Sequence, residues 1–198
     1  MFAKDWKKDL FTIPNVLSLF RLLLIPVYVV LYLRAEKPED YFLAAAILAV
    51  SCLTDLIDGK IARHFNMISN TGKILDPLAD KATQFTLIVC LTIQLQYPVL
   101  MFLAALFVIK EVFQAVAGFL ILRKGKILKG ALIAGKISTA VLFISLIVLV
   151  LIPNISKTVV YIIAGVDIAF LLISFVSYIR LYYTHSPMIQ SIDESIDK

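Results

Sequence analysis

The chain has 198 residues, of which 61% are hydrophobic and 17% are charged, with a formal net charge of +5. A soluble domain of this length needs more polar surface to cover its core, so the composition excludes an ordinary soluble fold. Several apolar stretches reach the length that a helix needs to cross a bilayer, which indicates an integral membrane protein.

The first segment of the chain mixes lysines with large apolar residues. Phe2, Trp6, Leu10 and Phe11 fall on one side of a helix, and the lysines fall on the other. This pattern predicts an amphipathic interfacial helix over residues 1–12 that lies along a membrane surface. A solvated N-terminal tail is the competing interpretation.

Six apolar segments follow, and short polar or basic stretches separate them. The predicted spans are residues 14–33, 41–63, 72–95, 99–122, 132–152 and 158–183. They predict an all-α integral membrane bundle of six transmembrane helices. We expect one domain over residues 1–198, with a polar tail at 186–198.

The basic residues lie mainly on one side of this arrangement. If the N-terminus is cytoplasmic, the 60–73 and 122–136 connections and the C-terminus share its side, and only Arg34, Lys37 and Lys157 fall outside. The positive-inside rule therefore predicts a multi-pass protein with both termini in the cytoplasm. We expect it in a bacterial cell membrane.

Four aspartates lie in the second and third predicted spans, near the connection between them. Asp55 and Asp58 are three residues apart and Asp76 and Asp80 are four apart, so each pair shares a helix face. Carboxylates at membrane depth are costly and repel one another unless cations lie between them. Because all the ligands are oxygens, the sequence predicts a site for Mg²⁺ or Mn²⁺.

Small and basic residues accompany these aspartates. Gly59 directly follows Asp58, and Gly72 lies one helical turn before the third aspartate, where a glycine allows close approach of a helix or a ligand. Arg63 offers a forked cation that suits a phosphate oxygen. Pro77 lacks a backbone N–H, which favours the first turn of a helix that starts at this point.

Residues 55–80 contain the pattern D-x-x-D-G-x-x-A-R, then eight residues, then G-x-x-x-D-x-x-x-D. The pattern is complete and resembles the signature of the CDP-alcohol phosphotransferases, also called CDP-alcohol phosphatidyltransferases. The segments T-I-P-N-x-L-S-x-x-R at 12–21 and D-P-L-A-D-K at 76–81 resemble the phosphatidylglycerophosphate synthase and cardiolipin synthase branches. The count of six predicted spans agrees with the same family.

The resemblance implies a role for each site residue. Asp55, Asp58 and Asp76 would bind one or two divalent ions that hold the diphosphate of a CDP-linked donor. Asp80, also at the metal site, would be the general base on the acceptor hydroxyl. The donor pocket would be lined by Asp55, Asp58, Gly59, Ala62, Arg63 and Gly72.

The resemblance also implies the reaction. The chain would be an enzyme of phospholipid biosynthesis that transfers the phosphatidyl group of CDP-diacylglycerol to an alcohol, among membrane lipids, and releases CMP. By analogy with the family we expect a homodimer, and we expect no nucleic acid partner.

The acceptor alcohol is predicted from the basic residues. An anionic acceptor such as glycerol 3-phosphate needs cations, and the candidates are Lys110, Lys136, Arg123 and Lys126. Two segments, Lys110-Glu111 and G-K-I-S-T at 135–139, resemble those of phosphatidylglycerophosphate synthases, with one departure each. The departure at Ser138, where a lysine is common, leaves open a cardiolipin synthase that uses phosphatidylglycerol. An inositol phosphate acceptor also remains open.

Structural interpretations of these cations compete with the functional ones. The basic loop residues also fit a role in topology or in attraction to anionic lipids, and Glu111 also fits simple neutralisation of Lys110. A different class of protein, a cation or proton transporter, would also place aspartates inside a membrane. We favour the transferase, because the charges cluster near one membrane face and all four aspartates are present.

Overall fold

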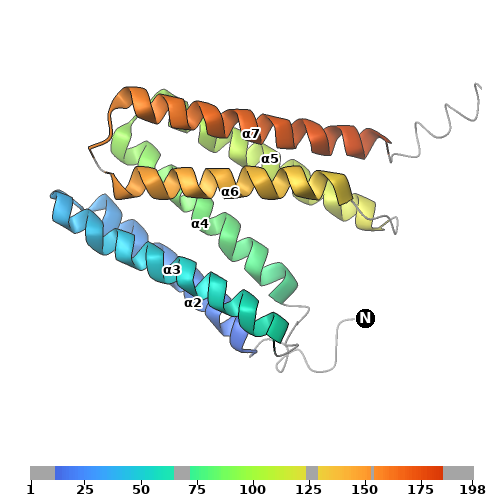
Figure 1. The fold of residues 1–198 in the computed structure, drawn as a ribbon, viewed down its shortest axis with the longest axis horizontal. Coiled ribbons are helices and arrows are strands. Elements are labelled where there is room, and N and C mark those ends of the chain that lie inside the picture. The colour runs from blue at the N-terminus through green and yellow to red at the C-terminus, as the bar shows by residue number, and fades with distance from the viewer. Residues whose placement is uncertain (1–11, 65–71, 124–128, 153, 185–198) are drawn as a thin grey trace, which may run out of the picture. The chain divides into compact units, whose positions relative to one another are not determined.

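The computed structural model describes residues 12–64, 72–123, 129–152 and 154–184, and every regular element within them is an α-helix. The helices, labelled as in Figure 1, are α2 Ile13–Leu33, α3 Pro38–His64, α4 Gly72–Leu95, α5 Pro98–Arg123, α6 Lys129–Leu151 and α7 Lys157–Thr184. The all-α class is therefore confirmed. The predicted interfacial helix at 1–12 falls almost entirely outside the described residues, and the tail at 186–198 falls wholly outside them.

The helix boundaries follow the predicted spans closely, and local chemistry explains them. Proline begins α3 and α5, where its missing N–H removes no helical hydrogen bond. The Asp40 carboxylate accepts hydrogen bonds from the N–H groups of Glu36 and Lys37, at 3.1 and 3.0 Å, and so caps the start of α3. At the end of α4, Gln96 adopts a positive φ of 52° and its N–H reaches the Thr92 carbonyl.

One local prediction is wrong. Pro77 was expected in the first turn of a helix, but α4 already begins at Gly72 and contains Pro77 in its interior. A proline at this position removes the bond that its N–H would have made to the carbonyl four residues earlier. α4 nevertheless continues as a helix through Pro77 to Leu95.

Four of the described helices are long and apolar enough to cross a membrane: residues Pro14–Leu33, Pro98–Phe119, Ile133–Leu151 and Lys157–Tyr182. Large apolar side chains on them are widely exposed, as is Leu23 at 68% and Ile144 at 63%. Such exposure suits contact with lipid and is costly in water. The chain is therefore a membrane protein. α3 and α4, which contain the aspartates and their basic neighbours, are not among these four described helices. The prediction of six transmembrane helices therefore remains a prediction.

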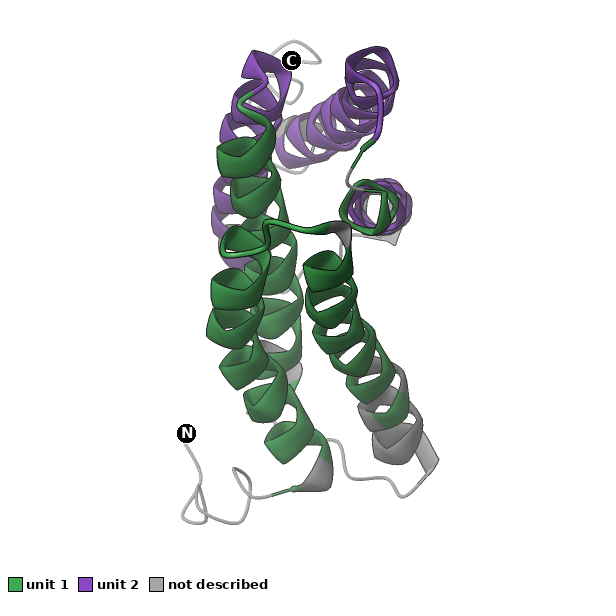
Figure 2. Cartoon of the chain, turned by 90° about the vertical axis from the view of Figure 1, so that its left-hand side faces the viewer, with its two compact units in different colours: residues 1–96, 148–154 green, residues 97–147, 155–198 purple. Residues whose placement is uncertain are grey.

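The chain divides into two compact units, coloured in Figure 2. Unit 1 comprises Met1–Gln96 and Val148–Asn154, and unit 2 comprises Tyr97–Ile147 and Ile155–Lys198. In unit 1, α2 packs against both α3 and α4. In unit 2, α5 packs against α7, where the rings of Phe113 and Phe175 meet edge to face at 5.2 Å. The division leaves the prediction of a single domain untested.

Unit 1 places the two ends of its helices in different chemical surroundings. At one end, Tyr32 stacks on Tyr28 and meets Tyr41 edge-on, with ring centroids 5.5 and 5.4 Å apart. The Gln94 amide donates a hydrogen bond of 2.6 Å to the Tyr41 hydroxyl at the same end. At the other end, α2 begins, α3 ends and α4 begins (Figure 1). This second end contains the aspartates.

Candidate active site

α4 provides two of the four predicted metal ligands. Asp76 and Asp80 are both partly buried and lie four residues apart, so they share one face near the start of the helix. Gly72, one turn before Asp76, is buried. The prediction that Asp76 and Asp80 form a carboxylate pair on one helix face is therefore consistent with where α4 begins.

α2 supplies a direct partner for this pair that the sequence analysis did not assign. The Ser18 hydroxyl donates a hydrogen bond to Oδ1 of Asp76, across 58 residues of chain. Ser18 is fully buried, and so are Asn15 and Arg21, three residues to either side. These three residues form a polar stripe on α2, which is otherwise one of the most apolar helices.

α3 holds the other half of the predicted site. The backbone of Asp55, Asp58, Gly59, Ala62 and Arg63 is helical, and these residues occupy the last three turns of α3. Their side chains lie outside the described residues. The structure therefore places their backbone at the same end of unit 1 as Asp76 and Asp80, and their contacts with a donor stay predictions.

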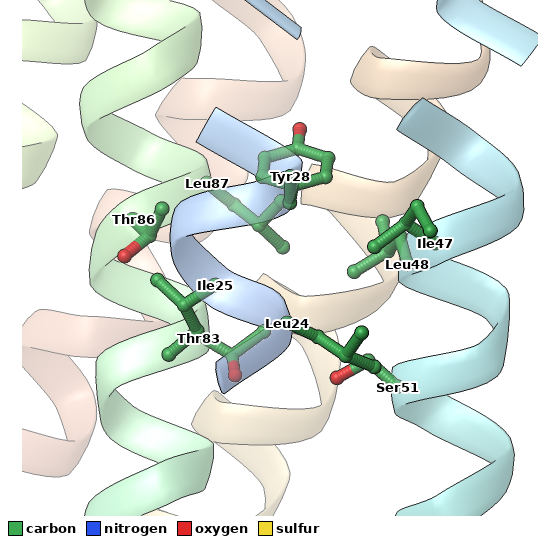
Figure 3. Close-up of a pocket in the computed structure, with 9 residues that line it drawn as sticks. All are labelled: Leu24, Ile25, Tyr28, Ile47, Leu48, Ser51, Thr83, Thr86 and Leu87. Atoms are coloured by element: carbon green, nitrogen blue, oxygen red, sulfur yellow. The ribbon is translucent and has the colours of Figure 1, made fainter. Parts of the chain in front are cut away.

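A small cavity lies next to these residues, further into unit 1 (Figure 3). Side chains from α2, α3 and α4 surround it, including Tyr28, Ser51 and Thr83. Its volume is about 10 Å³, which is room for one water molecule at most. Ser51 lies one helical turn before Asp55, and Thr83 lies three residues after Asp80, so the cavity lining begins about one turn from the aspartates along α3 and α4.

The available donors suit a hard divalent cation. Within the described part of the chain, no three His, Cys, Asp or Glu side chains form a metal-binding group. The described pair, Asp76 and Asp80, offers carboxylate oxygens, which Mg²⁺ and Mn²⁺ prefer. Ser18 meets a further requirement, since metal-binding carboxylates in proteins are themselves hydrogen-bonded. The described residues therefore fit such an ion, and Asp55 and Asp58 would complete the ligand set.

Unit 2 holds the residues predicted to bind the acceptor. Lys110 is almost completely buried and forms a 2.8 Å ion pair with Glu111, as the structural interpretation of this pair expected. Lys136 is exposed near the start of α6. Arg123 ends α5 but its side chain is not described, and Lys126 lies outside the described residues. Lys136 is thus the described candidate whose charge is accessible to a ligand.

Two further features of unit 2 were not predicted. Tyr178 on α7 reaches Gly135 on α6, where an added Cβ would lie 3.0 Å from the tyrosine oxygen. Asp167, within the span of α7, is 1% exposed and lies near Ser145. Asp167 is an exception to the clustering of charges near one membrane face, because it lies close to the middle of an apolar helix.

These observations define a class of protein. It is a helical membrane protein with a pair of partly buried carboxylates, and its complete four-aspartate pattern lies at one end of the first three described helices. Residues 11–178 match the family model described as CDP-alcohol phosphatidyltransferase. The chain belongs to this family.

Curated relatives agree with the family match. Over 83 residues the chain is 43% identical to "Cardiolipin synthase (CMP-forming)" of Streptomyces coelicolor, and this match covers 41% of this chain and 39% of that protein. Over 71 residues it is 42% identical to "CDP-diacylglycerol--glycerol-3-phosphate 3-phosphatidyltransferase" of Escherichia coli, covering 36% of this chain and 38% of that protein. The protein of that same name from Rickettsia bellii is 39% identical over 69 residues, covering 35% of this chain and 38% of the relative. The matches thus span less than half of each relative.

Proposed function

We propose that this chain is an enzyme that transfers the phosphatidyl group of CDP-diacylglycerol to an alcohol and releases CMP, with glycerol 3-phosphate as the acceptor. The observation that carries the proposal is the complete four-aspartate pattern, distributed over the end of α3 and the start of α4 in a chain of this family. The family match supports a transferase over the cation or proton transporter that intramembrane aspartates also fit.

The proposed donor site uses the residues of α3 and α4. Asp55, Asp58 and Asp76 would hold one or two Mg²⁺ or Mn²⁺ ions, and these ions neutralise charge on the diphosphate when bound. Gly59, Ala62 and Gly72 would leave room for the nucleotide, and Arg63 would pair with a phosphate oxygen. The remaining ligand, Asp80, would also act on the acceptor.

The proposed reaction is a single displacement at phosphorus. Asp80 would take the proton of the acceptor hydroxyl, and the hydroxyl oxygen would form a bond to the phosphorus that bears the diacylglycerol. The phosphoanhydride bond then breaks, and its electron pair leaves with CMP. Proximity accounts for much of the expected acceleration, because donor and acceptor are held against one carboxylate face.

Glycerol 3-phosphate is the favoured acceptor because the chain offers cations to an anion. Lys136 is exposed and is the leading candidate, while Lys110 already pairs with Glu111. Arg123, the last residue of α5, and Lys126, three residues later in the sequence, remain candidates on sequence alone.

Cardiolipin synthesis from phosphatidylglycerol is the second candidate. Ser138 occupies a place where phosphatidylglycerophosphate synthases commonly have lysine, and this side chain is 1% exposed. A buried serine supplies no charge at that point, so the acceptor region of this chain is less cationic than the pattern it resembles. The match to a Streptomyces coelicolor protein named cardiolipin synthase supports the same alternative.

We also propose the membrane arrangement that the sequence predicts. All six described helices would cross a bacterial cell membrane as one domain, with the aspartates and both termini on the cytoplasmic side. Residues 1–12 would lie along that surface, and two copies would form a homodimer. Accessibility labelling of single cysteines at residues 4 and 157 tests the orientation, since only the first is expected on the cytoplasmic side.

The acceptor panel is the experiment that tests the function. Purified protein with CDP-diacylglycerol and Mg²⁺ or Mn²⁺ should release CMP with glycerol 3-phosphate, and release should stop with a chelator and return with excess ion. Release with phosphatidylglycerol alone would favour the cardiolipin alternative. Release with none of the alcohols, glycerol 3-phosphate, phosphatidylglycerol and inositol phosphate, would overturn the transferase proposal.

Two variants test the roles within the reaction. Asp80→Asn should abolish CMP release while binding of CDP-diacylglycerol is kept, because three carboxylates remain for the donor. Lys136→Ala should raise the KM for glycerol 3-phosphate far more than the KM for the donor. Normal turnover in Asp80→Asn would remove that residue as the base, and an unchanged KM in Lys136→Ala would remove that lysine from the acceptor site.

A further inference from the structure

The hydrogen bond between Ser18 and Asp76 joins the apolar helix α2 to a carboxylate near the start of α4. Ser18 is 0% exposed and lies in the span of α2, where a buried hydroxyl without a partner is destabilising. Its Oγ lies within hydrogen-bond distance of two acceptors, Oδ1 of Asp76 and, at 3.1 Å, the carbonyl of Pro14. A serine has one hydroxyl proton, so it donates fully to one of them at a time.

Packing alone does not require the Asp76 contact. A carbonyl one turn earlier satisfies several hydroxyls in these helices, as Ile173 does for Ser177 at 2.7 Å and Ala79 does for Thr83 at 2.9 Å. Ser18 has the equivalent carbonyl available at Pro14. It also reaches a carboxylate, and a hydrogen bond to an ionised acceptor is about twice as strong as one to a neutral acceptor.

We propose that Ser18 is a positioning residue that fixes the Asp76 carboxylate for binding of a divalent metal ion. This inference rests on the proposed function, which makes Asp76 a ligand. The hydrogen bond to Oδ1 fixes the rotation of the carboxylate, and each carboxylate oxygen has a second lone pair with which to bind a cation. Partners of this kind orient ligands, and their loss weakens metal binding by about 10–100-fold.

The location of Ser18 strengthens this inference. α2 packs against both α3 and α4. A hydrogen bond from α2 therefore sets the position of the Asp76 carboxylate relative to α2, the helix that also packs against α3. Asn15 and Arg21, three residues to either side of Ser18, are also buried, at 1% and 2% exposure. The Asp76 carboxylate thus has a hydrogen-bond donor from a neighbouring helix in place before any ion arrives.

The test measures binding of Mn²⁺ itself, by electron paramagnetic resonance of the full chain in detergent without donor or acceptor. Ser18→Ala should weaken Mn²⁺ binding by about 10–100-fold, and Ser18→Thr, which keeps the hydroxyl, should restore most of the affinity. Ser177→Ala is the matched control, because it removes a serine hydroxyl bonded only to a carbonyl within its own helix. That control should bind Mn²⁺ like the wild type.

Turnover supplies a second readout. If Ser18 only positions Asp76, Ser18→Ala should need about 10–100-fold more Mn²⁺ for half-maximal CMP release, while kcat at saturating Mn²⁺ stays close to that of the wild type. A fold defect would instead lower kcat at every Mn²⁺ concentration and lower the unfolding temperature. Either that result, or Mn²⁺ affinity unchanged in Ser18→Ala, would overturn the inference.

The two proposals fail in different ways. If the wild type binds Mn²⁺ and Ser18→Ala weakens that binding, but no alcohol yields CMP, then the transferase proposal fails and the role of Ser18 stands. If CMP is released normally and Ser18→Ala has wild-type Mn²⁺ affinity, the transferase stands and the role of Ser18 is wrong.

Discussion

Replacement of Gly135 by alanine tests how closely α6 and α7 approach in unit 2. A Cβ at this position would lie 3.0 Å from the Tyr178 oxygen and 3.2 Å from its Cε2 atom. Tyr178 is 4% exposed, so its ring has little room to move away. Overpacking of this kind costs about 1–3 kcal/mol. It opposes the gain of about 1 kcal/mol that alanine brings to a helix interior.

Two other glycines separate these opposing effects. An added Cβ at Gly118 on α5 or at Gly165 on α7 meets no atom within 4 Å, so alanine there should bring only the helical gain. Gly135→Ala should therefore be less stable than either control by about 1–3 kcal/mol, which is the overpacking cost alone. For a chain of this size, 1 kcal/mol shifts the melting temperature by about 2–4 °C.

The assay is thermal unfolding of the three variants in one detergent, followed by circular dichroism. Tyr178→Phe in the Gly135→Ala background should recover part of the loss, because it removes the oxygen that the new methyl group contacts. If Gly135→Ala melts at the same temperature as Gly118→Ala and Gly165→Ala, the close contact between α6 and α7 is wrong.

Three further predictions concern polar contacts outside the aspartate site, and melting temperature checks each of them. Glu111→Gln should destabilise unit 2 by about 3 kcal/mol or less, because it removes the charge paired with buried Lys110; Lys110→Met in the same background should recover stability, and a further loss would refute the pairing. Tyr41→Phe should cost about 0.5–1.5 kcal/mol for each hydrogen bond lost, to Gln94 and to a backbone carbonyl. The backbone N–H groups of Lys37 and Glu36, which donate hydrogen bonds to the Asp40 carboxylate, lower the pKa of that carboxyl from 3.8. The stabilisation of the folded state by these bonds is therefore present above pH 3.8 and is lost as the pH falls through the lower folded-state pKa. Asp40→Ala should abolish that pH-dependent part, and an identical pH profile in both proteins would contradict it.

The course of the helices could be predicted from the sequence because hydropathy and turn chemistry agree along the chain. The break before Pro98 illustrates this: the predicted interruption at 96–98 is where Gln96 takes a positive φ and ends α4. Apolar length fixed the remaining boundaries to within a few residues. The boundaries of α4 also matched, but Pro77 lies in the interior of this helix and not in its first turn, as its chemistry had indicated.

The pairing of the aspartates on their helices was predictable, and their partner was not. Spacing along a helix shows that Asp76 and Asp80 share a face, since only the helical period is needed. It does not show that Ser18, 58 residues earlier, points at Asp76, because that contact depends on how α2 packs against α4. The same limit applies to Gly135 and Tyr178, whose contact joins two helices.

The arrangement of polar groups in unit 1 suggests why the carboxylates lie where they do. The end with Tyr28, Tyr32 and Tyr41 is closed by ring contacts and an amide, and its Asp40 carboxylate is exposed and caps the start of α3. The opposite end contains the starts of α2 and α4 and the end of α3, so the aspartates lie within a few turns of the helix ends. A charged group near a helix end reaches water more easily than one at mid-span, which lowers its cost in a membrane. In the proposed enzyme, a divalent ion and a water-soluble acceptor would then arrive from one aqueous side, while the apolar halves of the same helices would hold the site beside the lipid that carries the donor.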